Sequence, residues 1–170
     1  GALFTPPYDL LLGRRTYDIF AAYWPYADGE NKPMGEAFDA ANKYVMTRGD
    51  QPLDWQNSHR MRGVEDVAAI KQTEGADLVI QGSSEIYPAL LSAGLIDTLI
   101  TMTYPVILGR GKRLFGAGTP VDKLEMTDHR VTAKGTVIAT YTPGGTQPPY
   151  PDEAPIPILS DREVERREKI

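Results

Sequence analysis

The chain has 170 residues, enough for one ordinary domain with a hydrophobic core, and its 41% hydrophobic and 24% charged residues are typical of globular proteins. The formal net charge of −5 argues against a general binder of nucleic acid or membrane surfaces, and the absence of cysteine excludes disulfides, thiolate metal sites and a cysteine nucleophile. Because there is neither an apolar run of about 20 residues nor a basic signal-type start, a cytoplasmic protein is expected.

The first part of the chain alternates short strands with helices. Residues 8–12 are apolar and end at Gly13, which predicts a buried strand. Residues 16–23 carry apolar side chains at helical spacing. A second helix is predicted to open at Pro33, because proline is tolerated in a first turn. Residues 44–47 then predict a second short strand.

The middle of the chain repeats this alternation after a long connection. Residues 48–62 are expected to be loop-like, because glycine and proline interrupt them. A helix is predicted over residues 64–71, and a strand over 78–80. The next helix is predicted to begin near Ser84 or Glu85 and to end at Ala93, with a glycine as its C′ residue.

The last part of the domain favours β-structure. Residues 98–108 predict a longer strand, whose interior Pro105 indicates a bulge or an edge position. Residues 124–132 and 136–142 predict a hairpin. The order of elements therefore predicts an α/β fold with a mainly parallel sheet and an antiparallel hairpin at its edge.

A change of composition divides the chain into residues 1–143, the folded domain, and 144–170, a proline-rich and charged tail. Within the tail, residues 160–170 are compatible with a short charged helix that has Ser160 as N-cap. Two interpretations stay open. The tail is either solvated or an arm that packs on a second subunit.

Three segments suited to anions follow three of the predicted strands. Residues 82–87 combine glycine, two serines and a helix start, where unpaired backbone N–H groups stabilise a phosphate. Residues 13–16 add two guanidiniums and a hydroxyl at a helix start. Thr47 and Arg48 follow a third strand, and are suited to a ribose 2′-phosphate. Each segment alone also fits an ordinary turn or surface arginine, but together they would share one edge of the sheet and span one dinucleotide.

Other chemistry finds less support in the sequence. Two histidines without cysteine offer no metal-ligand cluster, so no metal is expected. The basic turn at residues 109–113 is either a phosphate site or a plain glycine-rich turn, and the plain turn is favoured.

Five segments in this order resemble the dihydrofolate reductase superfamily, and most of all the branch similar to the reductase domain of bifunctional riboflavin-biosynthesis enzymes. The segments are L-L-L-G-R-R-T-Y, Y-V-M-T-R, V-I-Q-G-S-S-E-I-Y, L-I-D-T-L-I-T-M-T-Y-P-V-I-L-G-R-G-K-R-L-F and V-T-A-K-G-T-V-I-A-T-Y. The resemblance covers residues 8–143. It implies a dihydrofolate reductase-like fold and the use of NADPH to reduce a pyrimidine or pteridine ring.

The resemblance also implies roles by position. The residues implied to hold the cofactor pyrophosphate are Gly13, Arg14, Arg15 and Thr16. Thr47 and Arg48 would contact the adenosine ribose and its 2′-phosphate. The residues implied to follow the pyrophosphate and the nicotinamide ribose are Gly82, Ser83, Ser84, Glu85, Ile86 and Tyr87. Tyr17, Phe20 and Trp24 are candidate walls of the substrate pocket. No catalytic residue is assigned, and a homodimer is expected from the resemblance.

Two departures from the family pattern matter. The first strand of the family and its following loop have no counterpart in the sequence, so the sheet should lack a central strand and expose unpaired edges. Either residues are missing or a partner supplies that strand. Ser83 also stands where many relatives have a second glycine, and its side chain would narrow the approach of the cofactor. A non-catalytic NADP-binding or dimeric interaction protein with a degenerate substrate site is therefore the alternative to a reductase.

Overall fold

A computed structural model describes residues 7–120, 123–144 and 160–168. The strands are β1 (Tyr8–Gly13), β2 (Lys43–Met46), β3 (Ser58–Met61), β4 (Asp77–Val79), β5 (Leu99–Thr103), β6 (Leu124–Val131) and β7 (Val137–Pro143). The α-helices are α1 (Arg14–Ala21), α2 (Lys32–Ala40), α3 (Val64–Lys71), α4 (Tyr87–Ser92) and α5 (Asp161–Arg167). The 3₁₀ turns are η2 (Trp24–Tyr26), η3 (Gly29–Asn31) and η4 (Ser84–Ile86).

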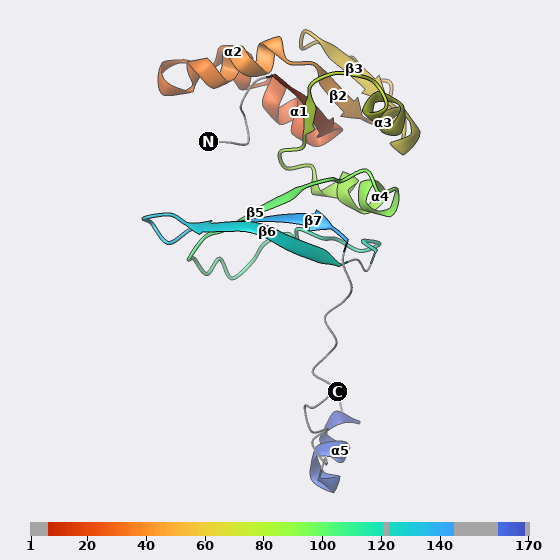
Figure 1. The fold of residues 1–170 in the computed structure, drawn as a ribbon, viewed down its shortest axis with the longest axis vertical. Helices are drawn as coiled ribbons and strands as arrows, with labels where there is room; N and C mark the ends of the chain where they lie inside the picture. The colour runs from red at the N-terminus through yellow and green to blue at the C-terminus, as the bar shows by residue number, and fades with distance from the viewer. Residues whose placement is uncertain (1–6, 121–122, 145–159, 169–170) are drawn as a thin grey trace.

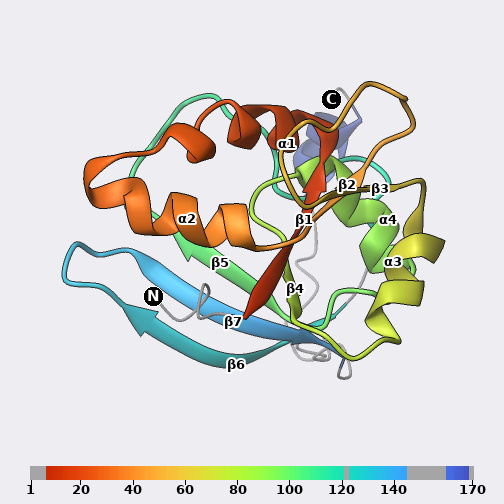
Figure 2. The ribbon, with the colours of Figure 1, turned by 90° about the horizontal axis from the view of Figure 1, so that it is seen from above.

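The first four strands form one parallel sheet in the order β3-β2-β1-β4. Seen from above, α1 and α2 lie on one side of β1, whereas α3 and α4 lie on the other (Figure 2). This is the mixed α/β architecture with helices on both faces that alternating strands and helices predict. All four strands point the same way, so their carboxyl ends meet at one edge.

Side chains that alternate along β1 supply both hydrophobic cores. Leu10 and Leu12 face α1 and α2, where the core includes the buried Phe38. Leu11 points to the opposite face and packs with Val67 and other residues of the α3 and α4 side. The period of two in a strand explains why an uninterrupted apolar run is needed here, since both faces of this strand are covered.

The last three strands form a separate antiparallel sheet in the order β5-β7-β6. It lies as its own layer beneath the parallel sheet, with α4 between the two layers (Figure 1). The predicted hairpin is confirmed as β6 and β7. Within the described residues β4 pairs only with β1 and β5 only with β7, so the strands form two sheets and β4 and β5 each have an unpaired edge.

Two predicted elements were wrong in extent. Residues 48–62 were expected to be loop-like, but Ser58–Met61 form β3, a polar strand that pairs with β2. The strand predicted over residues 98–108 ends at Thr103. Beyond it the N–H of Val106 donates to the carbonyl of Tyr104 at 2.8 Å, a tight turn around Pro105 that takes the chain out of the ladder.

Helix ends elsewhere agree with the sequence. Gly94 has φ +64° and its N–H donates to the carbonyl of Leu91, so the predicted glycine does follow α4. The short charged helix is present as α5, and Ser160 occupies its N-cap position without a side-chain hydrogen bond. Most of the proline-rich segment, residues 145–159, lies outside the described residues.

A buried lysine closes the amino-terminal end of β2. Lys43 is fully buried, and its ammonium donates to the carbonyls of Phe38, Asp39 and Ala41 at 2.8 to 3.0 Å, which caps the end of α2. The ammonium also lies 4.4 Å from the centroid of the Trp55 ring. Burial lowers the pKa of Lys43 to about 8, against the opposing effect of nearby aspartates.

Candidate dinucleotide site

Three predicted anion-binding segments lie at one edge of the parallel sheet. Gly13 ends β1, Thr47 follows β2, and Gly82 follows β4, and these strands are mutually parallel. The prediction that the segments share one edge is confirmed. Ligands of open α/β sheets bind at this edge, because the loops there leave a crevice.

Direct contacts join the first and third segments. The N–H of Gly13 donates to Oγ of Ser83 at 2.8 Å. At Gly82, which has φ +76°, an added Cβ would lie 3.8 Å from the side chain of Thr16, so the two turns are neighbours. Ser83 itself has φ 58° and ψ 39°, a left-handed conformation that is costly for a residue with a side chain. The Ser83 hydroxyl accepts from the backbone N–H of Gly13, one of the residues that the resemblance implies to hold the pyrophosphate.

The helix after β4 starts in two stages. Ser84–Ile86 form the 3₁₀ turn η4, and the α-helix begins only at Tyr87. Ile86 is buried and packs in the core with Leu90, while burial raises the pKa of the Tyr87 hydroxyl. The two residues at the end of the predicted segment thus anchor it to the core, and Ser84 and Glu85 are the members that stand at its open side.

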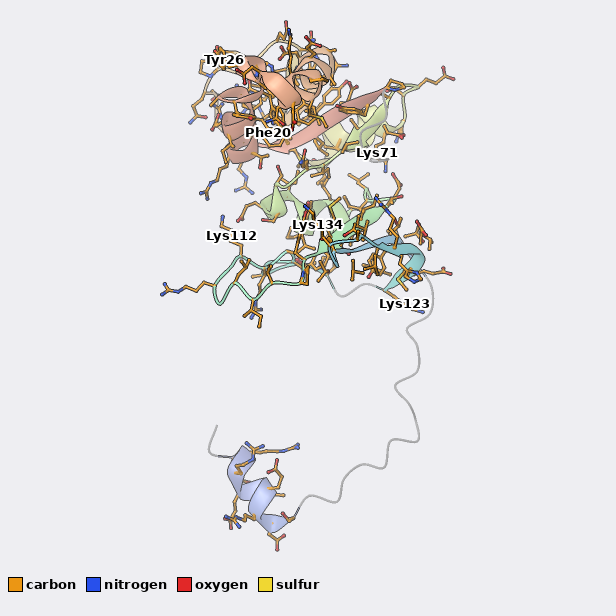
Figure 3. All side chains as sticks on the ribbon, turned by 90° about the vertical axis from the view of Figure 1, so that its left-hand side faces the viewer. Phe20, Tyr26, Lys71, Lys112, Lys123 and Lys134 are labelled. Carbon is orange, nitrogen blue, oxygen red and sulfur yellow. The ribbon has the colours of Figure 1, made fainter. Side chains whose placement is uncertain are left out.

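A hollow of about 550 Å³ adjoins this turn. Its lining includes Ser84, Glu85 and Pro88 on one side and Lys112 and Arg113 on the other. Figure 3 labels Lys112 on the loop that leaves the antiparallel sheet. Residues 109–113, which the sequence analysis favoured as a plain turn, thus contribute to a hollow beside the candidate site. This proximity is visible only in the three-dimensional structure.

The arginines at the start of α1 differ in their surroundings. The guanidinium of Arg14 donates to Asp18 at 2.8 Å and to the carbonyls of Gln51 and Pro52 at 3.0 Å each. Arg15 is exposed, and no ion pair or hydrogen bond involves its side chain among the residues described. Arg15 is therefore better placed than Arg14 to meet an anion, since Nε of Arg14 already donates to Asp18 and Nη1 to the loop after β2.

That loop, residues 48–52, is held by three guanidiniums. Arg14 reaches it from α1, and Arg60 and Arg62 reach it from the end of β3. The accepting carbonyls are those of Arg48, Gly49, Gln51 and Pro52. The side chain of Arg48 is exposed and, within the described part of the chain, has no such partner. Arg60, in β3, and Arg62, the residue after that strand, were not identified from the sequence because residues 48–62 were expected to form a loop.

The three aromatic candidates for pocket walls pack into the core that faces α2. Tyr17 is 2% exposed, and its hydroxyl accepts from the N–H of Trp55 at 2.9 Å. Phe20 stacks on Phe38 with ring centroids 5.7 Å apart, and Trp24 meets the same ring edge-on at 4.9 Å. Figure 3 shows Phe20 in this upper layer. Tyr17 thus lines the core, while substrate contact by Phe20 and Trp24 stays a prediction.

Two further findings concern the described residues alone. No helix among them is long and apolar enough to cross a membrane. No group of three or more histidine, aspartate or glutamate side chains in those ranges is placed to hold a metal ion.

Comparison with known proteins decides the family. The RibD C-terminal domain family matches residues 8–139. The chain belongs to this family. A protein of Bacillus subtilis (strain 168), the uncharacterized protein YyaP, is 27% identical over 135 residues, which cover 78% of this chain and 72% of that protein. The resemblance proposed from the sequence is confirmed.

Solved structures support the fold. A protein of Shewanella sp. PV-4, provisionally assigned to riboflavin biosynthesis, superimposes with a TM-score of 0.64 at 20% identity, over 85% of this chain and 78% of that one. RibD of Acinetobacter baumannii superimposes with a TM-score of 0.56 at 16% identity and 80% coverage of this chain. The chain spans about half of that protein, 47% of its length. At these identities the likeness establishes the fold and no more.

Proposed function

We propose that this RibD C-terminal domain protein is an NADPH-dependent reductase that transfers a hydride to a small pyrimidine- or pteridine-like heterocycle. The observation that carries the proposal is the convergence of three anion-suited segments at one edge of the parallel sheet, two of which are joined by the hydrogen bond between Gly13 and Ser83. Membership of a family named for the C-terminal domain of RibD supports the riboflavin-biosynthesis type of reaction.

The residues at this edge fit a phosphorylated dinucleotide. Arg48 and Thr47 would contact the 2′-phosphate and its ribose, because a guanidinium pairs with phosphate through a fork of donors. Arg15, Thr16 and the turn at Gly82 would hold the pyrophosphate, where Gly82 has no Cβ to obstruct a close approach. Arg14 would contribute through the loop that it holds.

When bound, the nicotinamide supplies the hydride. The chain would orient the acceptor ring. The hollow beside Ser84 adjoins the proposed dinucleotide site, and we propose it as the space for this ring. Lys112 and Arg113 would bring positive charge to that hollow, and Glu85 would bring a negative charge. We assign no proton donor.

The alternative is a non-catalytic NADP-binding or dimeric interaction protein. It is favoured by the division of the sheet between β4 and β5 and by the burial of Tyr17, which removes one of the candidate pocket walls. A homodimer is compatible with both functions, and sedimentation would test it.

The experiment that separates the two functions has two stages. NADPH binding to the full chain is measured first by fluorescence titration. NADPH oxidation is then followed by absorbance with pteridines and phosphoribosylated pyrimidines as acceptors. Binding with turnover supports the reductase, whereas binding without turnover of any acceptor supports the alternative. A chain that binds no NADPH would contradict the reductase and the NADP-binding form of the alternative, and would leave the dimeric interaction protein.

A further inference from the structure

Asp50 forms an ion pair with Arg62, whose guanidinium also contacts Arg48, the residue proposed to bind the 2′-phosphate. Oδ1 of Asp50 lies 2.5 Å from Nη2 of Arg62. The other terminal nitrogen, Nη1 of Arg62, donates to the backbone carbonyl of Arg48 at 3.0 Å. Arg62 is thus adjacent to Arg48 at the edge of the sheet, and one face of its fork is taken by a carboxylate of the same loop.

The ion pair is built in a way that lets a stronger anion replace the carboxylate. The side chains of Arg62 and Asp50 are 54% and 85% exposed, and ion pairs this open to water contribute little to stability. A phosphate carries more charge than a carboxylate and presents three acceptor oxygens, so it is the better partner for a guanidinium. The second bond of Arg62, to the Arg48 carbonyl, would keep it in place during the exchange.

We propose that Asp50 is an internal competitor for the 2′-phosphate of NADPH, and that Arg62 is a second specificity-determining cation beside Arg48. Without dinucleotide the Asp50 carboxylate pairs with Arg62. When NADPH binds, the 2′-phosphate takes this guanidinium and the carboxylate returns to solvent. NADH has no group that competes for Arg62. The inference rests on the proposed use of NADPH.

The charge state of Asp50 agrees with this role. The hydrogen bond and the positive charge of Arg62 hold the pKa of Asp50 below its usual range, with a smaller contribution from Arg60. The carboxylate is therefore ionised at neutral pH. It both occupies the cation and repels an incoming phosphate, and loss of its charge should favour NADPH alone.

The test uses the full chain and titrates NADPH and NADH into four variants by calorimetry. D50N should tighten NADPH by roughly three- to tenfold, because one competing charge is removed, and should leave NADH within about twofold. R62Q should weaken NADPH by about tenfold without changing NADH, and R62K should recover part of the loss. In the double variant D50N/R62Q, the gain from D50N should disappear, since both changes act through one guanidinium.

D97N is the matched control. Asp97 is also an exposed carboxylate paired with a cation, Lys71, but it follows α4 and is not part of the loop held by the three arginines. D97N changes the net charge by the same amount as D50N but lies away from that loop. It should therefore leave the affinities for NADPH and NADH unchanged. Thermal melting checks that each variant is folded, and D50N alone carries the test if R62Q fails to fold.

Four outcomes would overturn the inference. If D50N weakens NADPH, or alters NADPH and NADH equally, Asp50 only orders its loop. If NADPH binds the unaltered chain and D50N leaves its affinity unchanged, the internal competition is refuted while the proposed function stands. Failure of the unaltered chain to bind NADPH would contradict the proposed function and the inference together.

Discussion

At Ser83 a stabilising hydrogen bond is opposed by an unfavourable left-handed backbone conformation, and two substitutions separate these contributions to stability. Ser83→Ala removes the hydroxyl that accepts from the Gly13 N–H at 2.8 Å but keeps the unfavourable backbone angles. Loss of a partly buried hydrogen bond should lower the free energy of unfolding by about 1 to 2 kcal/mol. Ser83→Gly loses the same bond, but glycine adopts φ near +58° without strain and recovers about 1 kcal/mol.

We therefore expect the order of stability to be the unaltered chain, then S83G, then S83A. Urea unfolding followed by circular dichroism measures all three. Ser92, the last residue of α4, is the control position, because in a helix alanine is at least as favourable as glycine. The ranking of glycine and alanine should thus reverse between the two positions. If S83A were as stable as the unaltered chain, or more stable than S83G, the reasoning about Ser83 would be refuted.

Three further predictions concern the edge of the sheet and the buried lysine. Arg48→Ala should weaken NADPH by about tenfold and leave NADH unchanged, as measured by competition titration; equal effects would contradict the 2′-phosphate role. Arg14→Ala should weaken NADPH and NADH alike, because it releases the loop at Gln51 without removing a phosphate contact, and should lower the melting temperature. The pKa of Lys43 is about 8 in the folded chain and 10.5 in the unfolded chain. Between these values the unfolded state binds more protons than the folded state. The free energy of unfolding should therefore rise with pH, by at most about 3 kcal/mol. Lys43→Met should abolish that rise in urea unfolding between pH 7.5 and 9.5, and a rise of equal size in the variant would disprove the assignment.

The elements that the sequence predicts well are those whose signals are local. The apolar run at residues 10–12 requires a strand covered on both faces, and the glycine after α4 requires a helix end. The shared edge of the three anion-suited segments also follows from local patterns, since parallel strands align their carboxyl ends.

The elements that the sequence misses depend on partners distant in the chain. Ser58–Met61 are mostly polar, and they become a strand only because β2 offers them a hydrogen-bonding edge. The bond from Arg14 to a carbonyl 37 residues away is likewise invisible in the sequence, and its role as a phosphate ligand stays a prediction. The same is true of Arg62, whose role depends on the position of Asp50.

The attachment of β4 has a consequence for how the candidate site moves. β4 joins the sheet through three register pairs, to Tyr8, Asp9 and Leu10 of β1, and it has no second neighbour in the described chain. Segments with few backbone bonds open locally at lower free energy than the rest of a domain. A dinucleotide that bridges Gly82 to the ends of β1 and β2 would fasten this loosely held strand. Amide hydrogen exchange in β4 should then slow on binding far more than exchange in β2, which is paired on both sides.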